Sequence, residues 1–111
     1  MGDCIFCDIV SGKLPKALVY QDDKLMVFTD IKPLAPVHLL IVPKEHIASI
    51  NDLKKEHREL IGDMLLLAKK MAKEYDIHEG YKLAFNTGRK GGQLIDHLHL
   101  HLMGGWKEDQ V

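Results

Sequence analysis

The segment from His97 to Met103 reads His-Leu-His-Leu-His-Leu-Met, a strict alternation of histidine with apolar residues. In an extended strand successive side chains point to opposite faces, so the three imidazoles would share one face and the leucines the other. Alternate side chains along such a strand are roughly 6–7 Å apart. A row of imidazoles can bind a metal, act as nucleophile and acid or base, or hold an anion. Because burying three imidazoles without partners is costly, we interpret the segment as a functional centre rather than an ordinary half-buried strand.

A second group of reactive side chains is the Cys-x-x-Cys pair of Cys4 and Cys7. This is the spacing of half a tetrahedral zinc site. A redox pair is expected after a strand, opening the helix of a βαβ unit, whereas this pair begins the chain. Zinc needs two more ligands, and the seven histidines can supply them. The alternative is two buried thiols without a metal.

Length and composition fit one small globular domain. A chain of 111 residues is long enough for one core, so residues 1–111 are expected to form a single domain. The net charge of −1 gives no overall basic field, which argues against a nucleic-acid partner. The sequence has no apolar run long enough to cross a membrane and no signal-peptide pattern. We therefore expect a cytoplasmic protein with no membrane partner, whose two cysteines stay reduced.

The residues that position the reactive groups fall into short elements. Residues 4–10 carry apolar side chains at helical spacing and end at Ser-Gly, which predicts one or two helical turns packed on a sheet. Residues 19–21 and 25–29 flank a short polar turn and predict a hairpin. Residues 38–42 are predicted to form a third strand, stopped by Pro43.

The longest periodic segment predicts an amphipathic helix. Apolar residues recur at three- and four-residue spacing from Leu60 to Tyr75, with charged residues on the other face. This indicates a core helix of about five to six turns, and Asn51 or Asp52 can cap its start. Residues 81–86 are a fourth predicted strand, joined to the histidine segment by a glycine-rich loop. Strands before and after one long helix, with short connections, indicate an α+β fold with an antiparallel sheet.

Several ordered motifs, spread over nearly the whole chain, resemble the histidine triad (HIT) family. The histidine segment is similar to the family signature His-x-His-x-His-x-x, in which x is apolar. Similar to the family's N-terminal and central portions are Cys-Ile-Phe-Cys at 4–7, Leu14-Pro15, and residues 28–31 and 36–47. Asn86, Gly91-Gly92-Gln93 and Gly104-Gly105 resemble the nucleotide-binding branch of purine nucleoside phosphoramidases. The Cys pair resembles the zinc-carrying bacterial type.

The resemblance implies a HIT-like fold and a homodimer. The expected fold is an antiparallel sheet of about five strands with one long and one short helix. Family members pair through the long helix and an edge strand. Residues 81–86 could offer such an edge, and Leu65-Leu66-Leu67 gives the helix more apolar width than a small sheet needs. A two-fold dimer is also the commonest oligomer of soluble proteins.

The activity implied by the resemblance is nucleotidyl hydrolysis or transfer at an α-phosphorus. The substrates would be purine nucleoside phosphoramidates or acyl-adenylates, and the product a nucleoside monophosphate. His99, the middle histidine, would attack the phosphorus and form a covalent nucleotidyl-histidine that water resolves. His101 would hydrogen-bond the phosphate oxygens or the leaving group, and His38 would complete the catalytic set with the triad's first histidine, His97.

Binding residues follow from the same resemblance. Asp30 matches the carboxylate that accepts the ribose hydroxyls. Asn86 matches an asparagine near phosphate and ribose, although a plain strand-end turn residue is an equal interpretation. The apolar base pocket would be formed by Ile5, Phe6, Ile9, Phe28 and Ile31. The backbone around Gly92 and Gln93 would bind anionic oxygens, since glycine lets the backbone come close.

The resemblance also extends the metal hypothesis. In zinc-carrying relatives, and in galactose-1-phosphate uridylyltransferases, the Cys pair is joined by two histidines. The matching set in this chain is Cys4, Cys7, His46 and His97. Four protein ligands close a zinc site, so the ion would be structural, with one per chain, and would not activate water.

Departures from the family pattern keep other functions open. Leu94 stands where this branch commonly has a serine near the scissile phosphate, so one hydrogen-bond donor is missing. Asp96 replaces a frequent aromatic residue, and the tail 106–111 lacks the branch's Trp-Pro-Pro-Gly ending. The alternatives are a dinucleoside polyphosphate hydrolase, a weakly catalytic nucleotide-binding regulatory protein, and a hydrolase whose three triad histidines hold a catalytic zinc.

Overall fold

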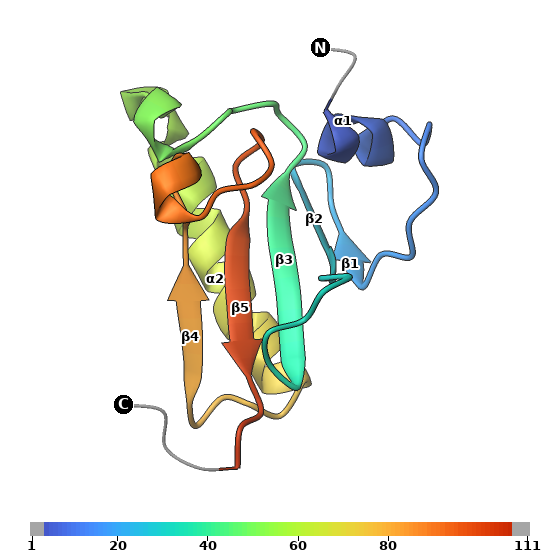
Figure 1. Ribbon diagram of the computed structural model, residues 1–111, viewed down its shortest axis with the longest axis vertical. Coiled ribbons are helices and arrows are strands. Elements are labelled where there is room, and N and C mark those ends of the chain that lie inside the picture. The colour runs from blue at the N-terminus through green and yellow to red at the C-terminus, as the bar shows by residue number, and fades with distance from the viewer. Residues whose placement is uncertain (1–3, 108–111) are drawn as a thin grey trace.

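The computed structural model describes residues 4–107 and is built on a five-stranded sheet with a long helix on one face and a short helix on the other (Figure 1). The strands are β1 (Tyr20–Gln21), β2 (Leu25–Thr29), β3 (Val37–Pro43), β4 (Tyr81–Ala84) and β5 (Leu100–Gly104). The helices are α1 (Ile5–Val10) and α2 (Arg58–Glu74). Three 3₁₀ turns lie at Ile50–Asp52, Lys55–His57 and Arg89–Gly91.

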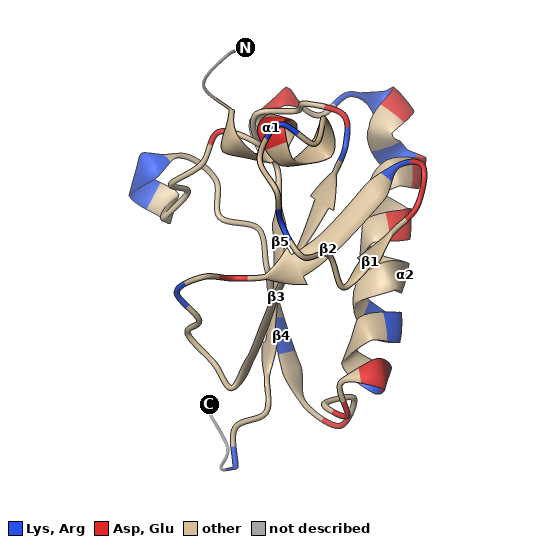
Figure 2. Cartoon of the chain, turned by 90° about the vertical axis from the view of Figure 1, so that its right-hand side faces the viewer, with Lys and Arg blue, Asp and Glu red and all other residues tan. Residues whose placement is uncertain are grey.

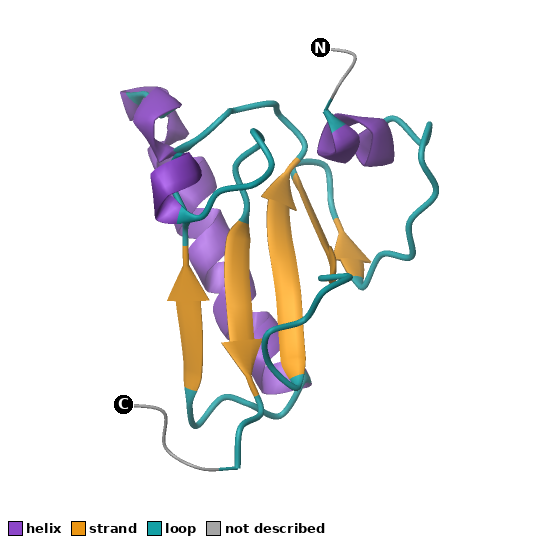
Figure 3. Ribbon diagram, in the orientation of Figure 1, coloured by secondary structure: helices purple, strands orange, loops and turns teal. Residues whose placement is uncertain are grey.

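The strands pair antiparallel in the order β1-β2-β3-β5-β4. Figure 3 shows this sheet with α2 behind it, so the predicted α+β fold of about five strands, one long helix and one short helix is confirmed. Residues 1–3 and 108–111 of the predicted domain, which include the end of the predicted tail, lie outside the described residues. Within residues 4–107, no helix has the length and apolar character that crossing a membrane requires.

The central strand β3 is buried on both faces, which explains its uninterrupted apolar sequence. Leu39 and Ile41 point into the core under α2, whereas Leu40 and Val42 join Phe6 of α1 in a second cluster on the opposite face. Lysines, arginines, aspartates and glutamates lie along α2 on the side turned away from the sheet (Figure 2). The two faces of the sheet are thus divided between α2, which covers the main core, and α1, whose Phe6 packs in the second cluster.

The start of α2 differs from the predicted one. Neither Asn51 nor Asp52 caps the long helix, because both lie in a separate 3₁₀ turn whose first residues are capped by Ser49. The helix itself begins at Arg58 and has 17 residues, just under five turns. His57 precedes it, and its Nδ1 accepts the Lys54 amide hydrogen at 2.9 Å. A second capped turn therefore takes the place of the expected first turn of the helix.

The histidine segment is only partly a strand. The β3–β5 pairing reaches from Gly104 to Leu100, so His97 and His99 precede the strand and the expectation of a strand over the whole segment is wrong. Before Leu100, the Leu98 amide instead donates to the Ile47 carbonyl at 2.7 Å.

The predicted division of side chains between two faces nevertheless holds. The leucines at 98, 100 and 102 are buried in the core that α2 covers. The imidazoles lie on the other face, where the His97 and His99 rings contact Phe6, and the His99 and His101 rings contact each other.

Gly104, at the end of β5, leaves no room for a side chain. A Cβ there would lie 2.7 Å from Ile77 Cδ1, 3.2 Å from Ile77 Cβ and 3.3 Å from the Gly80 carbonyl oxygen. We predict that Gly104→Ala lowers the free energy of unfolding by about 1–3 kcal/mol, because the neighbours must move. Gly91→Ala is the matched control, since nothing lies within 4 Å of its Cβ. Equal denaturant midpoints for the two variants would contradict the prediction.

Candidate functional site

The nucleophile candidate, His99, is held in one orientation by a backbone hydrogen bond. Its Nδ1 lies 2.7 Å from the His97 carbonyl oxygen. A carbonyl can only accept, so Nδ1 carries the hydrogen and Nε2 of the neutral ring presents a lone pair. The Phe6 ring packs edge-on against His99 with 5.3 Å between ring centroids. The buried imidazole is therefore held in one orientation, and its Nε2 makes no hydrogen bond to the described residues 4–107.

A second pair of histidines lies beside it. His38, near the start of β3, has its Nε2 2.9 Å from Nδ1 of His101, and 3.5 Å from Oδ2 of Asp30. The Leu34 amide donates to Nδ1 of His38 at 3.0 Å. Among residues 4–107, Nε2 of His101 is buried and has no hydrogen-bond partner.

Burial keeps this histidine pair uncharged. It lowers the pKa of His38, against the opposing effect of the nearby Asp30 carboxylate. Burial, together with the charges of the neighbouring His99 and His38, also lowers the pKa of His101 to about 4. Both rings are therefore neutral near pH 7, and each has one protonated and one unprotonated nitrogen.

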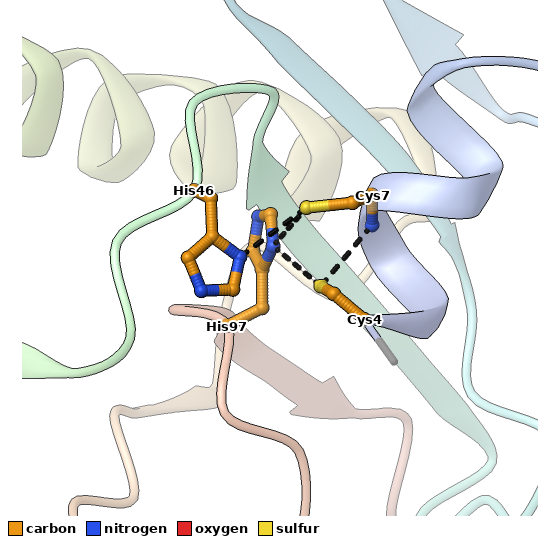
Figure 4. A group of neighbouring side chains, drawn as sticks. All are labelled: Cys4, Cys7, His46 and His97. Atoms are coloured by element: carbon orange, nitrogen blue, oxygen red, sulfur yellow. Dashed lines mark hydrogen bonds between the residues drawn. The ribbon is translucent and has the colours of Figure 1, made fainter. Parts of the chain in front are cut away.

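The four predicted metal ligands converge (Figure 4). Nδ1 of His97 lies 3.2 Å from Sγ of Cys4 and 3.6 Å from Sγ of Cys7, and Nδ1 of His46 lies 3.2 Å from Sγ of Cys7. All four ligand atoms are within 4.8 Å of one another. Nε2–H of His97 donates to the Pro43 carbonyl at 2.7 Å, which leaves Nδ1 unprotonated and aimed at the sulfurs.

The chemistry of this donor set fits a zinc ion. Two thiols and two imidazoles are a tetrahedral zinc set. Partial burial, together with a hydrogen bond to Cys4 and charge repulsion from it, raises the pKa of Cys7 to about 11. Two neighbouring thiolates therefore need a cation, which a metal ion in the cluster would supply. The cluster could hold a metal ion such as zinc.

A second group, Asp30, His38 and His101, also brings three potential ligand atoms within 4.8 Å of one another. The protonation of His38 argues against a metal at this group. The Leu34 amide donates to Nδ1 of His38, so the hydrogen of that neutral ring is on Nε2, which then has no lone pair for a metal. The triad histidines do not converge on one point either. His97 faces the cysteines and His101 faces His38, so a catalytic zinc held by all three is not supported.

The glycine-rich loop is shaped by a buried glutamine. Nε2 of Gln93 donates to the carbonyls of Ala48 and Ile95 at 2.7 and 2.9 Å, and its Oε1 accepts the Gly88 amide hydrogen at 3.0 Å. Gly88 and Gly92 have φ of 72° and 89°, values that favour glycine. The Gln93 side chain is therefore fully engaged by the protein and positions the loop, so only its backbone is free for a ligand.

Beside this loop, a cavity of about 370 Å³ borders the metal cluster. Its lining is formed by Cys4, Ile5, His46, Arg89, Leu94, Ile95 and Asp96. Arg89 and Asp96 form a two-point ion pair with nitrogen–oxygen distances of 2.8 and 3.0 Å, which lowers the pKa of the Asp96 carboxyl. The Leu94 side chain is 80% exposed at this opening.

The predicted nucleotide-binding residues differ in exposure. Phe6 and Phe28 are buried against each other with 5.5 Å between ring centroids, and Ile9 packs at the edge of the same cluster. Ile5 and Ile31 are 44% and 79% exposed. Asn86 lies next to the glycine loop, since its Nδ2 is 3.6 Å from the position of a Cβ on Gly92. Oδ1 of Asp30 accepts the Lys32 amide hydrogen at 2.9 Å.

Comparison with known proteins identifies the family. The chain matches the family model described as "Scavenger mRNA decapping enzyme C-term binding" over residues 3–110. It is 44% identical over 104 residues to the purine nucleoside phosphoramidase of Escherichia coli K12, covering 93% of this chain and 87% of that protein. It is 43% identical over 104 residues to Protein HitA of Neisseria gonorrhoeae, covering 94% and 97%. The chain belongs to the histidine triad (HIT) family.

Solved structures agree with this assignment. A HIT family hydrolase from Legionella pneumophila superposes with a TM-score of 0.92 at 46% identity over 95% of each chain. A HIT family hydrolase from Clostridium thermocellum gives 0.93 at 38% identity, covering 100% of this chain and 97% of that one. The predicted family and HIT-like fold are confirmed, and the protein is a HIT-family hydrolase.

Three contacts of this HIT site were not predicted from the sequence. They are the Leu34 amide on His38, the internal hydrogen bonds of Gln93, and the ion pair of Arg89 with Asp96. The first uses a backbone group, which leaves no mark in the sequence. The other two could have been suspected from a glutamine among glycines and from opposite charges seven residues apart, but neither signal is specific.

Proposed function

We propose that this HIT protein hydrolyses purine nucleoside phosphoramidates or acyl-adenylates at the α-phosphorus. The observation that carries the proposal is the orientation of His99, whose Nδ1 donates to the His97 carbonyl so that Nε2 is free to attack. Beside it, Nε2 of His101 is a buried group in need of a partner, which a phosphoryl oxygen would provide.

The proposed reaction has two displacements. Nε2 of His99 forms a bond to phosphorus while the phosphorus–nitrogen or anhydride bond breaks, and the leaving group departs with the electron pair and takes up a proton from solvent. Water then attacks the phosphorus of the nucleotidyl-imidazolium. The phosphorus–His99 bond breaks and its electron pair returns to Nε2. The attacking water gives up one proton, and a nucleoside monophosphate is released.

The nucleotide would be bound by groups around the histidines. Asp30 is proposed to accept the ribose hydroxyls through its Oδ2, because Oδ1 is already bonded to the Lys32 amide. Phe6, Phe28 and Ile9 offer an apolar wall for the base, with the exposed Ile5 and Ile31 at its margin. Asn86 and the backbone at Gly92 and Gln93 would contact the phosphate.

A second candidate function is nucleotide binding with weak catalysis. Leu94 is exposed beside the glycine loop and offers no side-chain hydrogen bond, where the phosphoramidase-like branch commonly has a serine. Hydrolysis of dinucleoside polyphosphates is the alternative within the same chemistry. Incubation with adenosine phosphoramidate and with diadenosine polyphosphates, followed by detection of AMP, separates the three functions.

We predict that His99→Ala lowers kcat on the preferred substrate at least about a thousand-fold, because the nucleophile is lost. Nucleotide affinity and the unfolding transition should change little. His78→Ala is the control, since that side chain is half exposed and pairs only weakly with Asp76 at 3.9 Å. Steady-state kinetics and calorimetric AMP binding make the comparison. Full turnover in the His99→Ala protein would refute the covalent mechanism.

We also propose that the cluster of Cys4, Cys7, His46 and His97 binds one structural zinc ion per chain. Protein prepared without added metal should contain about one zinc per chain, and Cys7→Ser should lower both the zinc content and the melting temperature. Elemental analysis and calorimetry measure the two, with His78→Ala as control. Metal-free protein of full stability would contradict this. Reduced thiols suit the cytoplasm, which is the proposed location.

The proposed oligomer is a homodimer formed through α2 and β4. Within residues 4–107, β4 is an edge strand that pairs only with β5. The leucines Leu83, Leu65 and Leu66 are 39%, 43% and 66% exposed. Light scattering at micromolar concentration should give twice the chain mass of 12.6 kDa. Leu66→Glu should shift the protein toward monomer, whereas Leu14→Glu, elsewhere on the surface, should not. A monomeric unmodified protein would exclude the dimer.

A further inference from the structure

The protons of two site histidines are fixed by one backbone amide. The Leu34 amide nitrogen lies 3.0 Å from Nδ1 of His38. An amide nitrogen can donate a hydrogen bond but cannot accept one, so Nδ1 must present its lone pair. In the neutral ring the hydrogen is then on Nε2. The Asp30 carboxylate, 3.5 Å from Nε2, favours the same tautomer.

The constraint passes from His38 to His101. Nε2 of His38 carries a hydrogen and lies 2.9 Å from Nδ1 of His101, so Nδ1 is the acceptor. The remaining hydrogen of the neutral His101 ring must then be on Nε2. This is the buried nitrogen that has no partner among residues 4–107. A buried N–H without an acceptor is costly, which points to an oxygen atom that a ligand supplies.

We propose that the Leu34 backbone amide is a positioning group that holds Nε2 of His101 as a hydrogen-bond donor to a phosphoryl oxygen of the substrate. The tautomers assigned to His38 and His101 do not depend on the reaction. Only the identification of the acceptor as a phosphoryl oxygen rests on the proposed function. Without the amide, His38 could place its hydrogen on Nδ1. His101 would then turn an electron pair instead of a hydrogen toward the phosphoryl oxygen.

The Leu34 side chain is not part of this arrangement. It is 75% exposed, in the loop between β2 and β3, whereas the His38 ring that its backbone contacts is buried. Replacement of the side chain and removal of the amide hydrogen are therefore separable. Leu34→Ala keeps the hydrogen and Leu34→Pro removes it.

The experiment compares these two variants by kinetics on the preferred substrate and by ¹H–¹⁵N spectra of the imidazoles. Leu34→Pro should lower kcat by a larger factor than it raises KM. The expected loss of kcat is about two-fold if the two His101 tautomers become equally populated, and about a hundred-fold if the Nε2–H donor of His101 is lost. Its His101 Nδ1 signal should move toward the protonated position. Leu34→Ala should match the unmodified protein in both measurements.

The unmodified protein gives a second test that does not depend on the folding of the proline variant. Its spectrum should show unprotonated Nδ1 and protonated Nε2 in both His38 and His101. A hydrogen on Nδ1 of either ring overturns the proposal, as does a proline variant with normal kcat or an alanine variant with the same loss. If no nucleotide substrate is hydrolysed, the proposed function fails while the spectra still decide the tautomers.

Discussion

The hydrogen bond from the His99 ring to the His97 carbonyl joins the two chemistries of this molecule. Strand pairing ends at Leu100, so the segment with the proposed nucleophile lies outside the paired strand and is held by side chains and by the hydrogen bond from the Leu98 amide to the Ile47 carbonyl. The His97 ring is held at both nitrogens, by the Pro43 carbonyl and by the cysteine cluster. An ion in that cluster would immobilise the same residue whose carbonyl orients His99. The proposed metal site and the proposed nucleophile thus both depend on His97.

Buried polar groups show how closely the rest of the site is specified. The buried polar residues are His38, His57, Gln93, His97 and His99. Each has hydrogen bonds to protein groups, as is usual for buried polar side chains. His101 is only partly buried, but among the described residues its Nε2 is the buried side-chain atom without a hydrogen-bond partner. The His101 ring that carries this nitrogen packs against the His99 ring, with 5.0 Å between the ring centroids.

The sequence predicted those features that depend on side-chain pattern. The period of two from His97 to Met103 correctly separated imidazoles from leucines, because burial of the leucines requires it even where the backbone leaves the sheet. The Cys-x-x-Cys spacing and the family resemblance predicted a metal cluster whose members converge. The predicted start of α2 was wrong because Ser49 and His57 each accept a backbone hydrogen bond in a separate turn, and such local hydrogen bonds compete with the helix. The amide of Leu34 was not predictable, since every residue except proline has one.

That last property has a consequence for how such a group can be detected. A contribution made by a main-chain hydrogen survives exchange of the side chain for alanine, so alanine scanning would score Leu34 as dispensable. Related sequences could vary freely at this position and exclude only proline. Substitution of proline at each position between β2 and β3 would therefore reveal a main-chain functional group that neither side-chain truncation nor sequence identity detects.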